Sequence, residues 1–200
     1  SENTLRLAYD AQLFDKVMVR ASLDSGKRRG DGFILSGLDY EVGVGATQPG
    51  LRYFDEADRD RTRGSVVFSA SPVDLVNVFV QFSTTRDEFL ADGSIPTGRE
   101  QFGLLSQDVD AVVGGVDISP NDMVHFGASL GRDEFSALQK SRNANPPPDA
   151  SWTDPARNWT VDNNEVVKTY MAYLDLEGLA NAKANVHASY ERNDSDNAFT

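Results

Sequence analysis

The segment LVNVFVQFS at residues 75–83 decides the fold, because its apolar side chains recur at every second position. The even positions are apolar: Val76, Val78, Val80 and Phe82. Polar residues occupy odd positions: Asn77 and Gln81. A period of two is that of a β-strand, since successive side chains of a strand point to opposite faces. The segment therefore predicts a strand with one apolar face and one more polar face.

The same alternation recurs along the chain and predicts eight strands and no helix. Further members of the apolar face are Val124, Phe126, Leu130, Val186 and Tyr190. Members of the polar face are Arg20, Arg63, Asp117, His125, Ser129, Lys183, Asn185, His187 and Glu191. If the chain is a membrane barrel, the first set faces lipid and the second set faces the lumen.

Short and long connections alternate strictly between the predicted strands. Tight turns are predicted at residues 11–15, 72–74, 120–122 and 178–181, and long loops at residues 25–57, 87–107 and 136–162. Proline and aspartate in the second and third turns favour tight reversals. The alternation places every tight turn at one end of an antiparallel up-and-down sheet. Short turns at one rim and long polar loops at the other are the layout of a transmembrane β-barrel of the outer membrane.

An internal repeat supports this layout. SPVDLV, from Ser71, followed by RDEF, ending at Phe89, recurs as SPNDMV, from Ser119, followed by RDEF, ending at Phe135. The second copy is shorter by two residues, and an even difference keeps the two faces in phase. Phe89 and Phe135 follow charged residues, so we expect them in an aromatic girdle at the membrane interface.

Composition excludes several classes of function. The formal net charge of −12 argues against nucleic acid as a partner. The chain has no cysteine, which excludes disulfides, thiolate zinc sites and covalent haem attachment to this chain. Two histidines do not suffice for a multi-histidine metal centre, and spacing suggests no Ser/His/Asp set. We therefore expect no enzymatic activity, catalytic residue, metal site or cofactor in this chain.

The alternative fold is a soluble, secreted β-sandwich that acts as a binding module, because its strands also alternate. Two observations favour the barrel. The apolar faces are rich in alanine and valine, and lipid chains fill the gaps between small side chains more easily than a packed core does. The predicted strands are also longer than ordinary globular strands and match the length needed to cross a bilayer at a tilt.

Four features of the sequence form a recognisable set: FDEADRDRTR at residues 54–63, the Ser-Pro-x-Asp turns, ALQKSRNANP at residues 137–146 and DPARNW at residues 154–159. In this order they resemble the MtrB/PioB family of decahaem-associated outer-membrane barrels. The resemblance covers roughly residues 50–192. It implies a large barrel in the cell outer membrane that sheaths a multihaem c-type cytochrome and serves extracellular electron transfer. It also implies that the haem belongs to the partner protein and that this chain carries no catalytic residue.

The polar face fits a lumen filled by a cytochrome and a lumen filled by water equally well. A porin-like diffusion channel is therefore the alternative function. Strand direction places both ends of the sequence on the loop side, so we expect residues 1–200 to form a single segment of a longer barrel.

Overall fold

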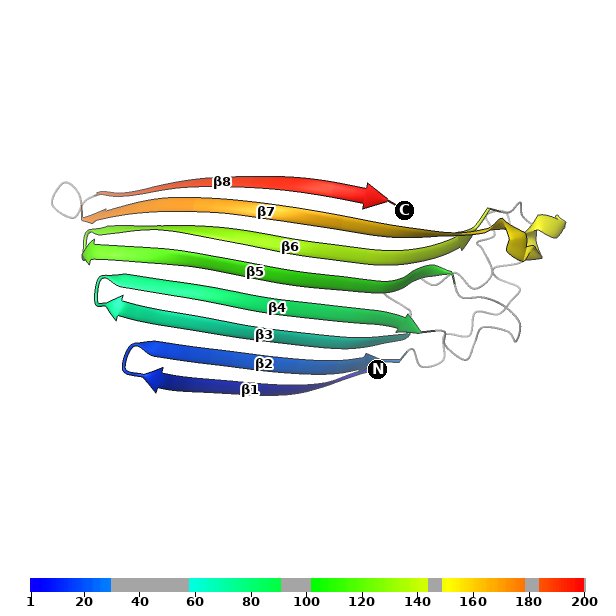
Figure 1. The fold of residues 1–200 in the computed structure, drawn as a ribbon, viewed down its shortest axis with the longest axis horizontal. Helices are drawn as coiled ribbons and strands as arrows, with labels where there is room; N and C mark the ends of the chain where they lie inside the picture. The colour runs from blue at the N-terminus through cyan, green and yellow to red at the C-terminus, as the bar shows by residue number, and fades with distance from the viewer. Residues whose placement is uncertain (30–57, 91–101, 144–148, 179–183, 200) are drawn as a thin grey trace.

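The computed structural model describes residues 1–29, 58–90, 102–143, 149–178 and 184–199. Within these ranges the chain forms one eight-stranded antiparallel sheet whose strand order follows the chain (Figure 1). The strands are β1 (Glu2–Phe14), β2 (Val17–Arg28), β3 (Asp58–Val73), β4 (Val76–Leu90), β5 (Gly103–Asn121), β6 (Val124–Arg142), β7 (Asn158–Gly178) and β8 (Ala184–Phe199). Two short 3₁₀ helices, η1 (Ala150–Thr153) and η2 (Pro155–Arg157), precede β7. The predicted all-β, up-and-down topology is confirmed.

The sheet forms a single layer, and the predicted alternative of a β-sandwich is wrong. A sandwich would press Val76, Phe126 and Val186 into a dry interior, whereas the side chains of Phe126 and Val186 are 39% and 48% exposed. The buried apolar residues of the described ranges are Phe89 and Phe102. No helix among the described residues is long and apolar enough to cross a membrane.

The hairpins are stepped along the sheet by repeated backbone hydrogen bonds. The Ser71 N–H donates to the Lys16 carbonyl oxygen, 2.9 Å away, and the Ser119 N–H donates to the Leu75 carbonyl oxygen, 2.8 Å away. Each bond ties the turn of one hairpin to the first strand of the next. Each turn therefore lies about two residues further along the strand direction than the turn of the preceding hairpin, or about one residue per strand. Figure 1 shows this progressive displacement of the turns.

The two copies of the internal repeat form the same local structure. The ladder between β3 and β4 shifts register between Ala70 and Val73, and the ladder between β5 and β6 shifts between Ile118 and Asn121. Both shifts lie at the Ser-Pro dipeptide, where proline offers no N–H to the ladder. The repeated motif therefore encodes a bulge and a turn together.

The turns are tighter than predicted. The two-residue turns are at residues 15–16, 74–75 and 122–123. The ranges 11–15, 72–74 and 120–122 were too early because the strands continue across the bulges into the turn. In the fourth, β7 ends at Gly178, whose φ of 66° favours glycine, and residues 179–181 lie outside the described part of the chain.

The strands also continue into the ranges predicted as loops. β2 and β3 reach residues 28 and 58, β4 and β5 reach 90 and 103, and β6 and β7 reach 142 and 158. The ranges 25–57, 87–107 and 136–162 were therefore too wide where the structure describes them. The physical reason is that hydrogen-bonded pairing does not require an apolar face, so polar residues extend the ladder beyond the apolar pattern.

Candidate functional site

The register gathers the side chains of the sheet into two faces, which we call the apolar face and the polar face. The apolar face holds every residue predicted to face lipid: Val76, Val78, Val80, Phe82, Val124, Phe126, Leu130, Val186 and Tyr190. The polar face holds the described residues predicted to face a lumen: Arg20, Arg63, Asn77, Gln81, Asp117, His125, Ser129, Asn185, His187 and Glu191. Lys183 lies outside the described residues.

Burial is reversed relative to a soluble protein. Along β6, apolar-face residues from Phe126 to Glu134 are exposed, whereas the polar-face residues between them are half-buried or buried. The same alternation is present along much of β4 and β7. A face that is both apolar and exposed is unfavourable in water, and lipid removes that cost.

The edge of the apolar face crosses the strands obliquely. From the turn towards the loops, the last apolar residue of this face before the first polar residue, with glycines passed over, marks the edge on each strand: Leu5, Leu23, Val66, Phe82, Val112, Leu130, Tyr170 and Tyr190, from β1 to β8. In register, Leu5 lies level with Ala198 of β8, which is eight residues beyond Tyr190.

This oblique edge gives the strands a tilt. A displacement of eight residues over seven strand-to-strand steps corresponds to a slope of about 40°, at about 3.4 Å per residue and about 4.8 Å between strands. Strands of transmembrane β-barrels are tilted by about 35–45°. If the edge of the apolar face follows the membrane plane, the strands therefore cross the membrane at the angle expected of a barrel.

Charges on the polar face are paired across strands. The arginine nitrogens lie 2.5–2.6 Å from aspartate oxygens in three pairs: Arg6–Asp24, Arg20–Asp10 and Arg61–Asp87. Asp87 is 3% exposed, which makes its pair the most enclosed of the three. In register, Arg63 lies opposite Asp24, and its charge therefore adds to the same group. Because these arginines are paired with aspartates, the polar face has a weaker electrostatic field than a face lined with charges of a single sign would have.

Both histidines have protein partners. His125 Nδ1 lies 2.9 Å from Ser119 Oγ, and His187 Nδ1 pairs with the Asp175 carboxylate. In register, Asp175 lies between the two histidines. No group of three or more possible metal-ligating side chains occurs within the part of the chain that the structure describes.

Other predicted polar-face residues have local roles. Asn185 Oδ1 accepts the Gly178 N–H at 3.0 Å, so this side chain helps to close the last hairpin. Glu191 accepts from Asn193 at 2.8 Å along the same strand. Asn77 lies opposite Asp117 in register.

Two of the remaining predicted residues lie beside apolar or small neighbours. Gln81 has Val67 and Val113 opposite it, and Ser129 has Gly115 on one of its sides. The polar face is thus a mixture of paired charges, small residues and apolar side chains.

Two aromatic rings cover glycines on the polar face, and sequence reasoning missed both. A Cβ added to Gly115 would lie 2.7 Å from the Phe79 ring, and one added to Gly127 would lie 2.5 Å from the Tyr173 ring. The Tyr173 hydroxyl donates to Asp117 Oδ1 at 2.7 Å. The rings therefore lie across the neighbouring strand. The signal is the pairing of an aromatic residue with a glycine, which only the register reveals.

The predicted aromatic girdle is wrong for both phenylalanines. Phe89 and Phe135 lie on the polar face, and Phe89 is 5% exposed. In each copy of RDEF the arginine, Arg86 or Arg132, lies on the apolar face. The phenylalanine follows it by three residues, and an odd spacing along a strand puts the phenylalanine on the opposite face.

A family model described as "Putative outer membrane beta-barrel porin, MtrB/PioB" matches residues 1–200. The chain belongs to the MtrB/PioB family. The match extends over the whole sequence, beyond the residues on which the resemblance rested. The description agrees with the oblique edge and the exposed apolar face of this MtrB/PioB sheet, because both are expected of an outer-membrane β-barrel. A comparison with curated proteins found no match.

Proposed function

We propose that this sheet is part of the wall of a barrel that sheaths a multihaem c-type cytochrome and so supports electron transfer across the outer membrane. The apolar face meets lipid, and the polar face meets the partner. The haem is held by the partner, and this chain supplies the insulating wall and the surface on which the partner rests.

The low relief of the polar face carries this proposal. Small residues line much of it in adjacent strands: Ser22, Ser65, Ser83, Ala111, Gly115, Gly127, Ser129, Gly131 and Ser189. The Phe79 and Tyr173 rings lie over glycines instead of projecting from the sheet. A folded protein can approach such a surface closely, whereas long projecting side chains would hold it away.

The charge pattern supports the same partner. Three arginine–aspartate pairs lie within the wall, so a protein surface of mixed polarity can be placed against them without leaving those charges unpaired. The backbone groups of each inner strand are paired with both neighbours, so the wall can be surrounded by hydrocarbon on its other side.

The alternative is a diffusion channel. The family description uses the word porin, and a polar face with hydroxyl, amide and charged groups also suits water. The two functions differ in what the lumen contains.

The test begins with the protein tagged and extracted from the outer membrane of cells that produce it. We expect a haem-absorbing protein to co-purify in a fixed ratio. In liposomes, the complex should reduce an external acceptor with electrons from an enclosed, impermeant donor, and small solutes should not leak. A barrel that purifies without haem and passes small solutes would refute the sheath.

A pair of adjacent substitutions separates lumen contact from general damage. Gly131→Trp places a ring on the polar face, where an added Cβ meets no atom closer than 3.6 Å. Leu130→Trp places the same ring on the apolar face, where Leu130 is 63% exposed. We expect about tenfold less haem with Gly131→Trp and wild-type haem with Leu130→Trp. Equal haem retention in both variants would contradict partner contact at this wall.

A further inference from the structure

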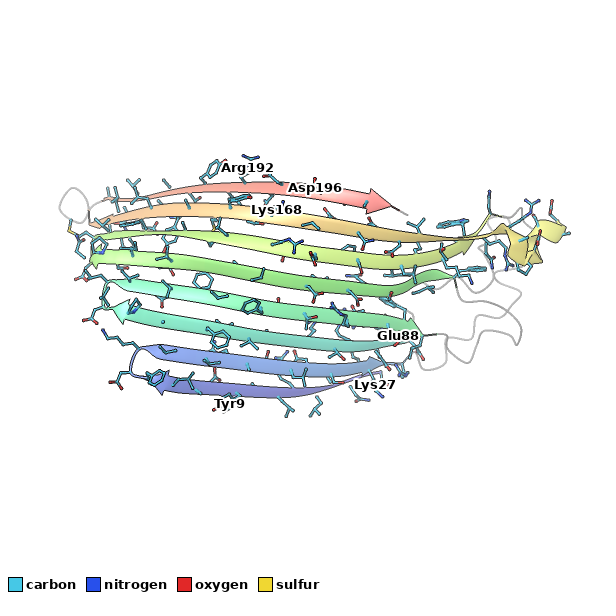
Figure 2. All side chains as sticks on the ribbon, in the orientation of Figure 1. Tyr9, Lys27, Glu88, Lys168, Arg192 and Asp196 are labelled. Atoms are coloured by element: carbon cyan, nitrogen blue, oxygen red, sulfur yellow. The ribbon has the colours of Figure 1, made fainter. Side chains whose placement is uncertain are left out.

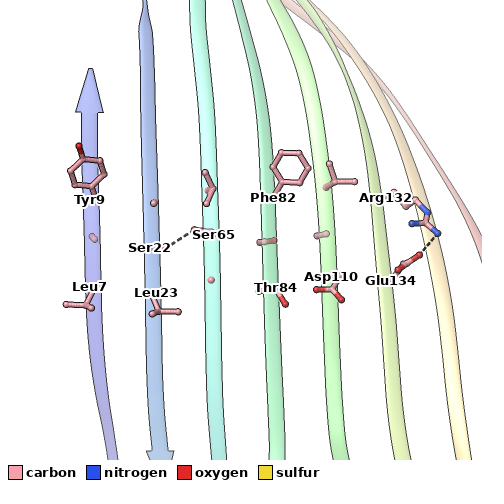
Figure 3. Close-up of a pocket in the computed structure, with 17 residues that line it drawn as sticks. Leu7, Tyr9, Ser22, Leu23, Ser65, Phe82, Thr84, Asp110, Arg132 and Glu134 are labelled. Carbon is pink, nitrogen blue, oxygen red and sulfur yellow. Dashed lines mark hydrogen bonds and ion pairs between the residues drawn. The ribbon is translucent and has the colours of Figure 1, made fainter. Parts of the chain in front are cut away.

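A furrow of about 690 Å³ crosses β1 to β6 on the apolar face (Figure 3). One side is formed by the row that includes Tyr9, Phe82 and Val112. The other is formed by the row one step nearer the loops, which includes Leu7 and Leu23. The furrow therefore runs between two neighbouring rows of side chains, at right angles to the strands.

Small residues make the furrow hollow. Gly64 interrupts the second row, and the nearest atom to a Cβ added there is 3.4 Å away. Ala21 interrupts the first row in the same part of the sheet. At β6 the furrow is closed by the ion pair between Arg132 and Glu134, which Figure 3 shows at its end.

The furrow changes from apolar to charged along its length. Because the edge of the apolar face is oblique, the β1 end lies inside the apolar region at Leu7 and Tyr9. The β6 end lies outside it, at Arg132, Glu134 and Asp110. Its direction thus leads from the hydrocarbon towards the headgroup region of a surrounding bilayer. This is the polarity gradient of a lipid molecule.

Three cations lie side by side beyond the charged end. On β6, β7 and β8 the first apolar-face residue past the apolar region is Arg132, Lys168 and Arg192, respectively. Figure 2 shows Lys168 and Arg192 on adjacent strands. Arg132 and Arg192 pair with Glu134 and Asp194.

Lys168 is the most available of these cations. Its side chain is exposed, and it forms no ion pair with any residue that the structure describes. Glu134 stands one row further from the apolar region than Arg132 and Lys168, which lie opposite each other in register. Asp194 stands one row further than Arg192 along β8 and lies opposite Lys168. The cations are therefore placed at the level that lipid phosphates occupy.

We propose that this furrow binds one phosphate-bearing lipid of the surrounding bilayer. An acyl chain lies along the furrow over Gly64, and the phosphate contacts Lys168 and Arg132. The proposal rests on the membrane position of the apolar face and not on the cytochrome.

The occupant is a lipid and not a peptide strand, because the furrow floor belongs to strands paired on both sides along most of its length. No free backbone donors or acceptors are offered to an added strand there. An acyl chain needs none, and it fills irregular apolar space. The charge at one end alone matches an amphiphile with a single anionic group.

The test uses the protein extracted in a mild detergent and titrated with two lipids that carry the same acyl chains. One is phosphatidylglycerol, and the other is diacylglycerol, which lacks the phosphate. Native mass spectrometry counts the bound lipid. We expect phosphatidylglycerol to bind about tenfold more tightly, since charge-assisted hydrogen bonds to phosphate are strong.

Variants separate the two parts of the site. Lys168→Ala and Arg132→Gln should remove the preference for phosphatidylglycerol, and Gly64→Val should weaken binding of both lipids by filling the furrow. Lys27→Ala is the matched control, because Lys27 is an exposed apolar-face lysine on β2, remote from the charged end. Equal binding of both lipids to the wild type, or an effect of Lys27→Ala as large as that of Lys168→Ala, would overturn the proposal. No readout involves haem, so the result is independent of the proposed sheath.

Discussion

Gly127→Ala should destabilise the sheet far more than substitution of Gly131, the other glycine of β6. The added Cβ would lie 2.7 Å from the Val116 carbonyl oxygen, which is backbone and cannot rotate away. It would also lie 2.5 Å from the Tyr173 ring and 2.7 Å from Asp117 Oδ1. The ring must leave its place over the glycine, which separates the Tyr173 hydroxyl from Asp117.

The magnitude follows from two effects. Loss of a hydrogen bond to a charged acceptor costs about 1.5 kcal/mol at the lower end of its range, which suits a half-buried tyrosine. Forcing an atom into occupied space costs about 1–3 kcal/mol. Alanine regains about 0.5–1 kcal/mol because glycine is unfavourable inside a strand. The expected net loss in the free energy of unfolding is about 1.5–4 kcal/mol.

The assay is chemical unfolding of the protein in detergent, followed by tryptophan fluorescence and by the mobility change that unfolded barrels show on gels. Gly131→Ala is the control on the same face of β6, where the added Cβ has ordinary contacts at 3.6 Å and beyond. We expect Gly131→Ala to be neutral or slightly stabilising. Equal stabilities of the two variants would refute the reasoning, and Tyr173→Ala should relieve part of the loss in the Gly127→Ala background.

Two further predictions concern the faces of the sheet. Phe126→Arg should lower the free energy of unfolding in lipid by about 2–4 kcal/mol, because it places a charge in hydrocarbon. Ser129→Arg on the polar face should change this free energy little. Similar losses in the two variants would contradict the assignment of the two faces, and a larger loss for Ser129→Arg would mean that they are reversed. Arg61→Ala should cost about 2 kcal/mol in the same unfolding assay, because it leaves the buried Asp87 carboxylate unpaired. Arg6→Ala should have no measurable effect, since Arg6 is 69% exposed. Comparable effects of the two substitutions would show that burial does not decide the strength of these pairs.

The sequence predicted the strand topology well because the signals are local. The alternation from Val76 to Phe82 needs only neighbouring residues to show which side chains share a face. The Ser-Pro-x-Asp motifs likewise place two of the turns to within about two residues. The ends of the strands on the loop side were missed, because β6 and β7 pair on to Arg142 and Asn158 without an apolar pattern to mark them.

The contacts between strands were not predictable from the same signals. Tyr173 and Gly127 are far apart in sequence, and the ring covers the glycine only because the register sets them opposite each other. The position of Phe89 at a strand end predicts a place in an interfacial girdle, but the alternation of side chains along β4 puts it on the polar face.

By itself, the sequence determined that this protein is a meander of strands with one apolar face, because side-chain alternation and turn chemistry act over a few residues. Only the tertiary structure decided the stepped register, and with it the oblique edge of the apolar face, the aromatic rings over glycines and the furrow that ends at Arg132. The reason is that register depends on which backbone groups pair across strands. In this sheet, the bulges and the hydrogen bonds between successive hairpins fix that pairing.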